Sequence, residues 1–254
     1  MFGFFKNRRR ARLRAQPLPE FWRTILEERV PYYPLLPGPL RMELDGCIQI
    51  LVQEKNFEGC GGLALTERMR LTVAAYAGLL LLRRETGYYP LLHSVLIYPG
   101  AFCVRRPEED EFGIVDEEEE IQEGESWEVG AVILSWKDIQ RDTRRFDGRN
   151  VILHEFAHQL FDAGELRLDD PVAQAEWTGV LEAHFDRHVR QVERRRKTFI
   201  DPYGAEDPSE FFAVITEAFF ETPEDLREYH PELYEQLCLY YRQDPVAYFH
   251  SPTE

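Results

Sequence analysis

The sequence predicts an α+β fold that is rich in helices and carries a small mixed sheet beside them. Two observations support this class. Apolar residues recur at the helical spacing of three and four over most of the chain, interrupted by capping residues and prolines. Between residues 93 and 136, short apolar and β-branched runs indicate strands instead. A small sheet beside many helices satisfies both patterns.

The first half of the chain is predicted to be helical. Helices are expected at 21–30 and 41–52, and the segment 54–62, EKNFEGCGG, is expected to be a glycine-rich turn. Thr66 can then cap a long apolar helix that continues to about residue 84.

Strands and further helices are expected in the second half. The expected elements are strands at 93–98, 102–105 and 129–136, and helices at 150–161, 171–197, 208–221 and 223–242, the last of which could be two helices.

The charge of the chain excludes one broad class of function. The net charge is −16, which argues against nucleic-acid binding over the whole molecule, because such proteins need a positive surface. Eleven acids and no Lys or Arg stand in residues 107–125. We interpret this block as a solvated surface loop, with an acidic flap that shields a site or engages a partner as the alternative.

The sequence also indicates a compartment. The start, MFGFFKNRRRARLR, is basic but lacks the apolar stretch of a signal peptide. No run approaches the roughly 18 apolar residues of a membrane span, and the four cysteines form no C-x-x-C pair. We therefore expect a cytoplasmic protein with reduced thiols and no transmembrane segment.

Residues 154–158 read His-Glu-Phe-Ala-His, the H-E-x-x-H pattern. On a helix, His154 and His158 lie one turn apart on the same face and can bind one cation. Glu155 points about 100° away and can reach a water molecule at the metal. The surrounding residues are apolar, so the two histidines and Glu155 would be buried. A bound metal would offset the free-energy cost of burying these polar side chains. The pattern predicts one catalytic Zn²⁺ per chain.

The third protein ligand must come from elsewhere in the chain. In metzincins the pattern continues with a glycine and then a histidine that is the third ligand. Here those two positions hold Phe161 and Gly164, so this chain lacks that ligand. Glu210 starts an apolar helix and is the best candidate, yet it also fits a capping box with Asp207. Glu217, two turns later, could be the ligand instead or could orient a ligand histidine. The residues alone leave these alternatives open.

A second histidine pair, His184 and His188, lies on the helix expected at 171–197. No glutamate follows the first histidine, and Arg187 and Arg190 are adjacent. These features favour a structural role over an auxiliary metal site.

Several segments together resemble the Mlc titration factor A family of zinc-dependent peptidases, of the gluzincin type. The similarity covers roughly residues 21–245. It is carried by EKNFEG, LTERMRL, IYPGAF, ILSW, NVILHEFAHQL, YGAEDPSEFFAVITEAFFE and YYRQDP, of which the long C-terminal motifs are the most specific.

The resemblance implies more than the spacing does. It implies a zincin-like core whose small mixed sheet lies beside the H-E-x-x-H helix. It makes His154, His158 and Glu210 the zinc ligands and Glu155 the catalytic base. It also implies that the Tyr203 hydroxyl stabilises the transition state. After HEFAHQL this chain has Phe-Asp-Ala-Gly where the family usually has an aspartate directly, so the rim of the site could differ.

The leading hypothesis is a peptidase that hydrolyses small peptides, as an aminopeptidase or endopeptidase, with zinc-activated water and Glu155 as general base. The resemblance adds a regulatory role through a transcriptional repressor protein as partner, without direct nucleic-acid binding. The alternative is a regulatory protein that sequesters a transcription factor and has little peptidase activity. We divide the chain into a basic tail (1–20) and a single peptidase domain (21–254), helical to about residue 92 and catalytic from about 93.

The run 131–136, AVILSW, is expected to be an edge strand along the cleft, where an extended peptide could add as one more strand. The alternative is a core strand paired on both sides, because the run is strongly apolar.

Overall fold

The computed structural model describes residues 2–100 and 130–249, with short pieces of strand between them, and side chains from residue 5 onward within those two ranges. The acidic block that we interpreted as a loop therefore lies mostly outside the described residues. Within the described part, none of the helices combines the length and the apolar character that crossing a membrane requires.

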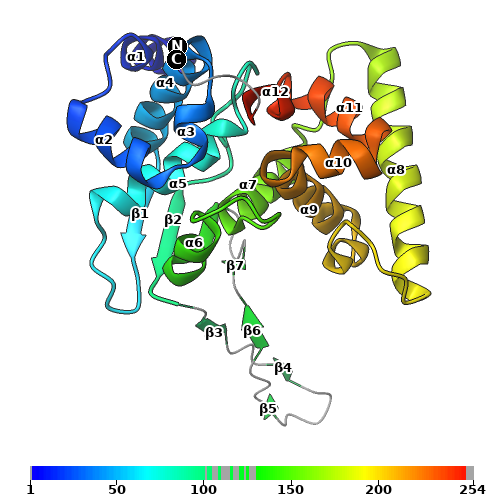
Figure 1. The fold of residues 1–254 in the computed structure, drawn as a ribbon. Helices are drawn as coiled ribbons and strands as arrows, with labels where there is room; N and C mark the ends of the chain where they lie inside the picture. The colour runs from blue at the N-terminus through cyan, green and yellow to red at the C-terminus, as the bar shows by residue number, and fades with distance from the viewer. Residues whose placement is uncertain are drawn as a thin grey trace.

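Helices dominate the N-terminal half, as predicted (Figure 1). They are α1 (Phe2–Arg14), α2 (Glu20–Arg29), α3 (Tyr32–Leu35), α4 (Gly38–Glu54) and α5 (Glu67–Leu79). Thr66 caps α5 as expected, because its hydroxyl accepts a hydrogen bond from the Met69 amide. The basic N-terminal segment forms α1, which packs on α4 and places Arg10 in a buried ion pair with Glu54, at 2.6 Å.

A small mixed sheet follows, and its strand order is β1-β2-β8-β7. Strands β1 (Asn56–Gly59), β2 (Ser94–Tyr98) and β8 (Ala131–Ser135) are parallel, with Val95 opposite both Phe57 and Val132. Strand β7 (Gly124–Glu125) pairs antiparallel with β8. The remaining short strands form two antiparallel pairs: β3 (Phe102–Val104) with β6 (Glu120–Gln122), and β4 (Glu108–Glu109) with β5 (Val115–Asp116).

Two predictions about this sheet are wrong. The glycine-rich segment 54–62 contains β1, because its Phe57 is buried against the core and the backbone pairs with β2. Gly59 is needed there for close approach: a Cβ would lie 2.2 Å from the Leu63 carbonyl oxygen. The expected edge strand is also wrong, because β8 lies between β2 and β7.

The strand at 129–136 also ends earlier than expected. Ser135 caps a helix, because its hydroxyl accepts a hydrogen bond from the Asp138 amide at 3.3 Å. Trp136 therefore begins α6 (Trp136–Asp142) rather than ending the strand.

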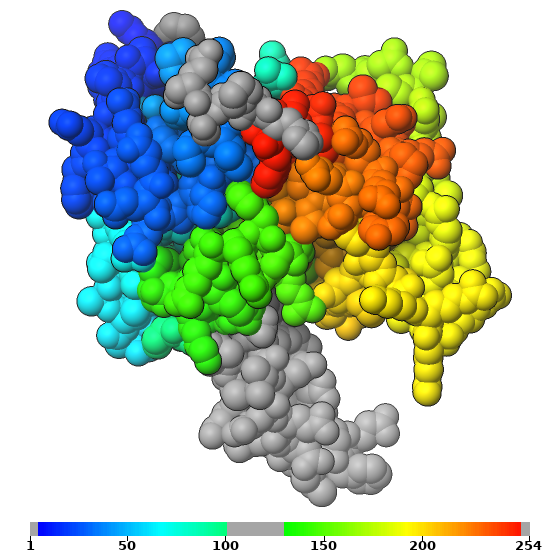
Figure 2. Space-filling model, in the orientation of Figure 1, coloured from blue at the N-terminus to red at the C-terminus, as the bar shows by residue number. Residues whose placement is uncertain are grey.

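The C-terminal half is helical, as predicted. Its elements are α7 (Val151–Asp162), α8 (Pro171–Glu193), the 3₁₀ turn η1 (Pro202–Ala205), α9 (Pro208–Glu221), α10 (Pro223–Tyr229), α11 (Pro231–Tyr241) and α12 (Pro245–Phe249). Figure 2 shows residues near 140 (green) between the N-terminal helices (blue) and the C-terminal helices (orange and red). Every residue of α9 from Phe211 to Glu221 is buried, and Phe212 packs edge-on against Tyr240. This helix fixes α7, its closest partner, in the centre of the fold.

Candidate metal centre

The helix that carries the H-E-x-x-H pattern starts at a buried cap. The Asn150 side-chain oxygen accepts hydrogen bonds from the Ile152 and Leu153 amides, each at 3.2 Å. Asn150 is fully buried, so the start of α7 is fixed from inside the protein. Because α7 is regular from this point, His154 and His158 lie one turn apart on the same face.

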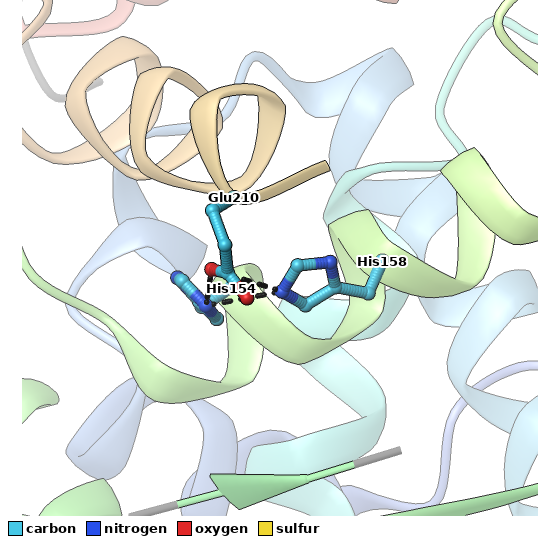
Figure 3. Close-up of side chains that lie close together, drawn as sticks. All are labelled: His154, His158 and Glu210. Atoms are coloured by element: carbon cyan, nitrogen blue, oxygen red, sulfur yellow. Dashed lines mark hydrogen bonds and ion pairs between the residues drawn. The ribbon is translucent and has the colours of Figure 1, made fainter. Parts of the chain in front are cut away.

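The third side chain comes from the start of α9. The Asp207 carboxylate caps this helix, accepting from the amides of Ser209 at 2.7 Å and Glu210 at 3.0 Å. The Glu210 carboxylate turns towards α7 and lies between the two imidazoles (Figure 3). Its Oε2 is 3.1 Å from His154 Nε2 and 3.4 Å from His158 Nε2. The cap and the carboxylate contact, which the sequence left as alternatives for this segment, are both present.

These three side chains form a group that could hold a metal ion, with ligand atoms all within 4.8 Å of one another. The two Nε2 atoms are 3.1 Å apart. For comparison, bonds of about 2.0–2.1 Å to a tetrahedral zinc place its ligand atoms about 3.3–3.4 Å apart. The triangle of donor atoms therefore has nearly the size that such an ion requires.

The outer ring nitrogens are held by other partners. His154 Nδ1 is 2.7 Å from Glu217 Oε1, and His158 Nδ1 is 2.8 Å from the Ser209 hydroxyl. If each Nδ1 donates its proton outward, both Nε2 lone pairs face Glu210. Glu210 Oε2 is itself buried and accepts no well-aligned hydrogen bond. Three electron-rich atoms thus face one another, an arrangement that a cation stabilises.

The electrostatics show that the group attracts positive charge, here in the form of protons. Burial alone would raise the pKa of Glu210, but the close contacts with His154 and His158 outweigh it and lower the pKa to about 2. Burial opposes protonation of His154, yet Glu210 and Glu217 raise its pKa well above the ordinary value. Both shifts mean that the carboxylates stabilise positive charge at the histidines.

Glu217 lies behind His154 rather than among the three inner ligand atoms. Its second oxygen accepts a hydrogen bond from the Asn150 amide at 2.6 Å. One carboxylate therefore joins the start of α7 to the outer nitrogen of a histidine, which fixes the orientation of that ring.

Glu155 is 4% exposed and lines the cleft beside the histidines. Its Oε2 is buried and has no hydrogen-bond partner within the described residues. Burial raises the pKa of Glu155, although the two histidines oppose the effect. A carboxylate whose pKa lies closer to neutrality is better suited to take up and return a proton.

Tyr203 lies on η1, across the cleft from α7. Asp201 caps this turn by accepting from the Tyr203 amide at 3.0 Å. The Tyr203 ring centroid is 6.0 Å from that of His154, and the side chain is 46% exposed. Burial of the hydroxyl and the negative charge of Glu210 raise its pKa, so the phenol remains a hydrogen-bond donor at neutral pH.

The two histidines, Glu155, Tyr203, Glu210 and Glu217 all line one cleft of about 1040 Å³. The lining comes mainly from α7, η1 and α9, and the residues before α7 contribute Arg149. No β8 residue contributes within the described part of the chain, so the strand expected to bind substrate does not reach the cleft.

The second histidine pair lies outside the group of three. His184 and His188 are both buried, at 4% and 3% exposure. His188 Nε2 donates to the Asp201 carbonyl, and His184 contacts Arg187. Among the described residues, only the group around Glu210 brings three candidate ligands together.

Sequence reasoning did not identify Ser209 and Asn150 as parts of the centre. Both look like ordinary capping residues in the patterns D-P-S-E and N-V-I-L. Their bonds to His158 and Glu217 depend on how α7 packs on α9, which no local pattern encodes.

Comparison with known proteins gives consistent matches over most of the chain. The family model described as glucose-regulated metallo-peptidase M90 matches residues 5–242. An uncharacterised protein, slr2042, of Synechocystis sp. is 40% identical over 94% of this chain and 89% of its own length. Mlc titration factor A of Yersinia pestis is 33% identical over 86% of this chain and 83% of its own length. The resemblance drawn from the motifs is confirmed.

Proposed function

The chain belongs to the glucose-regulated metallopeptidase family M90, and on this premise we propose that it is a zinc-dependent peptidase of small peptides. We assign the metal to His154 Nε2, His158 Nε2 and one Glu210 oxygen. Two imidazoles and one carboxylate are a typical ligand set of catalytic zinc, which leaves one position open. A zinc ion held there would supply Lewis-acid chemistry, polarising the scissile carbonyl and making water more acidic.

Glu155 is the general base in this proposal. Its buried, unpartnered oxygen beside the histidines is the single observation that carries the assignment. Glu155 would take a proton from the attacking water molecule and return it to the leaving amine. The raised pKa of Glu155 favours the first transfer, because a more basic carboxylate takes up the proton more readily.

Tyr203 and Glu217 support this chemistry from two sides. The Tyr203 hydroxyl would donate a hydrogen bond to the oxyanion that forms at the attacked carbonyl carbon. Glu217 accepts from His154 Nδ1 and so keeps the other nitrogen of that ring directed inward.

The experiment compares purified parent protein, Glu155→Gln and the control Glu206→Gln, each with its zinc content measured. Glu206 lines the same cleft but is exposed and is not part of the candidate ligand group found among the described residues. We expect Glu155→Gln to retain zinc and to lose at least about 10²-fold of peptide hydrolysis. Full activity in that variant would remove Glu155 from the mechanism.

A second function is favoured by the name of one relative. Mlc titration factor A is named for an interaction, and we propose as the alternative that this chain binds a transcriptional repressor, with or without hydrolysis. A zinc-loaded parent protein that cleaves no member of a peptide library, yet binds a repressor, would favour this alternative. A fully closed coordination sphere of four protein ligands would favour it too.

A further inference from the structure

A second cavity, of about 340 Å³, lies where α2, α5 and α6 meet. It shares no lining residue with the metal cleft, because its wall uses Trp136, Gln140, Thr143 and Arg144, whereas the cleft uses Arg141 and Asp142. Helix α6 therefore contributes residues to both cavities, Arg141 and Asp142 to the cleft and Trp136 and Gln140 to the second cavity.

Three arginines line this second cavity, which we call the arginine pocket. Arg29 is the last residue of α2, Arg68 lies in the first turn of α5, and Arg144 follows α6. Glu28 is the one acid among the lining residues. Within the part of the chain that the structure describes, none of the three guanidinium groups forms an ion pair, so the pocket has an excess of positive charge.

Arg68 shows that this charge is not fully compensated. Its Nε is buried and has no hydrogen-bond partner among the residues that the structure describes. Burial and the charge of Arg29 lower the pKa of Arg68, although Glu28 opposes them. A buried donor without a partner destabilises the fold, and an anion in the pocket would supply the missing acceptor.

The other lining residues limit which hydrogen-bond donors a ligand in this pocket can meet. The Thr72 and Thr143 hydroxyls donate to carbonyls of their own helices, at 2.9 and 2.7 Å. The donors left for a ligand are therefore mainly the guanidinium groups. Trp136 is partly exposed and adds a flat apolar surface to the wall.

We propose that the arginine pocket binds a small phosphomonoester. Guanidinium groups match phosphate oxygens with paired N–H donors, and a dianion compensates more of the excess charge than a carboxylate does. The indole of Trp136 would contact the ring or carbon portion of the molecule. The volume lies at the lower end of the range for small-molecule sites, which fits a compact ligand rather than a polymer.

The test uses the full chain with phenyl phosphate as probe and benzoate as a monoanion with the same ring. Binding is measured by calorimetry and by fluorescence, with Trp136→Phe identifying the responding tryptophan. We expect one phenyl phosphate per chain, at least 10-fold weaker binding of benzoate, and the same affinity after the metal is removed with a chelator. Binding that disappears on chelation would place the probe at the metal instead and overturn the proposal.

Variants of single arginines complete the test. Arg68→Gln and Arg144→Gln should each weaken phenyl phosphate binding at least 10-fold. The control is Arg70→Gln, on the same helix as Arg68 but paired with Glu67 and absent from the pocket lining. Arg144 is exposed, so its variant tests the site even if Arg68→Gln does not fold. Parent-like binding in a folded Arg144→Gln or Arg68→Gln protein would overturn the proposal.

Discussion

His188 Nε2 lies 3.0 Å from the carbonyl oxygen of Asp201, so a buried histidine of α8 holds the turn that carries Tyr203. Asp201 in turn accepts from the Tyr203 amide. Gly204 allows this turn to pack closely on its neighbours, because a Cβ at this position would lie 2.5 Å from Val214 Cγ2 and 3.7 Å from His188 Nε2. His188 is thus a positioning residue for Tyr203.

Replacing His188 with leucine should lower kcat by about 10- to 100-fold, because a small displacement of a catalytic group costs that much. KM and zinc content should stay the same. His184→Leu is the matched control, since His184 is equally buried one turn earlier and its polar partners are Arg187 and Glu232. In a Tyr203→Phe background the His188 change should have no further effect. Additive losses would mean that His188 acts by another route.

Glu210 and Glu217 should differ in their effect on metal binding. Glu210→Ala removes one of the three inner ligand atoms and should empty the site. Glu217→Ala loses only the bond behind His154 and should weaken zinc binding by about 10–100-fold. Competition with a fluorescent chelator measures both affinities, with Glu206→Ala as control. Parent-like zinc occupancy in Glu210→Ala would reverse the assignment.

The histidines around α8 should make the protein sensitive to acid. Burial, followed by the charge of Arg187, lowers the pKa of His184, and burial lowers that of His188. Burial and the neighbouring His184 lower the pKa of His230 to about 4, from an ordinary 6.5. The unfolded chain therefore binds more protons between these values, so stability present above pH 6.5 is lost as the pH falls towards 4.

Thermal unfolding at a series of pH values between 7.5 and 4 tests this sign. The charged groups near these rings are Arg187, Glu232 and Asp201, and the backbone carbonyl of Asp201 also accepts from His188. His230→Asn should flatten the decline in melting temperature below pH 6.5. An unchanged decline in this variant would show that other groups cause it.

Glu221 should have the opposite dependence on pH. It is 2% exposed, and burial raises its pKa to about 9. The side-chain amide of Asn150 opposes this shift by donating a hydrogen bond to Glu221 at 2.9 Å. Its contribution to stability is complete below the ordinary pKa of 4.5 and is lost as the pH rises towards 9. Glu221→Gln keeps the acceptor for Asn150 without the ionisation. Its stability relative to the parent should grow between pH 5 and 9 by up to about 1.4 kcal/mol per pH unit, measured by urea unfolding. A constant difference would show that Glu221 does not titrate in this way.

Local patterns predicted most of the helices and the pair of histidines on α7. H-E-x-x-H sets the two histidines one turn apart through helix geometry alone, and Asp207 caps α9 as its sequence predicts. The resemblance to a family selected Glu210 over Glu217, and in the folded chain Glu210 lies between the imidazoles whereas Glu217 lies behind His154.

Tertiary structure decided what depends on contacts between distant segments. Strand β1 exists because Phe57 is buried and β2 lies alongside, although its local sequence favours a turn. Strand β8 is internal because residues 124–125 pair with it, and no pattern within 131–136 encodes that partner. Ser209, His188 and Asn150 acquire their roles from the packing of α7, α8 and η1 around α9. Periodicity and capping are properties of neighbouring residues, whereas strand order and the outer bonds of a metal centre depend on which surfaces meet in the folded chain.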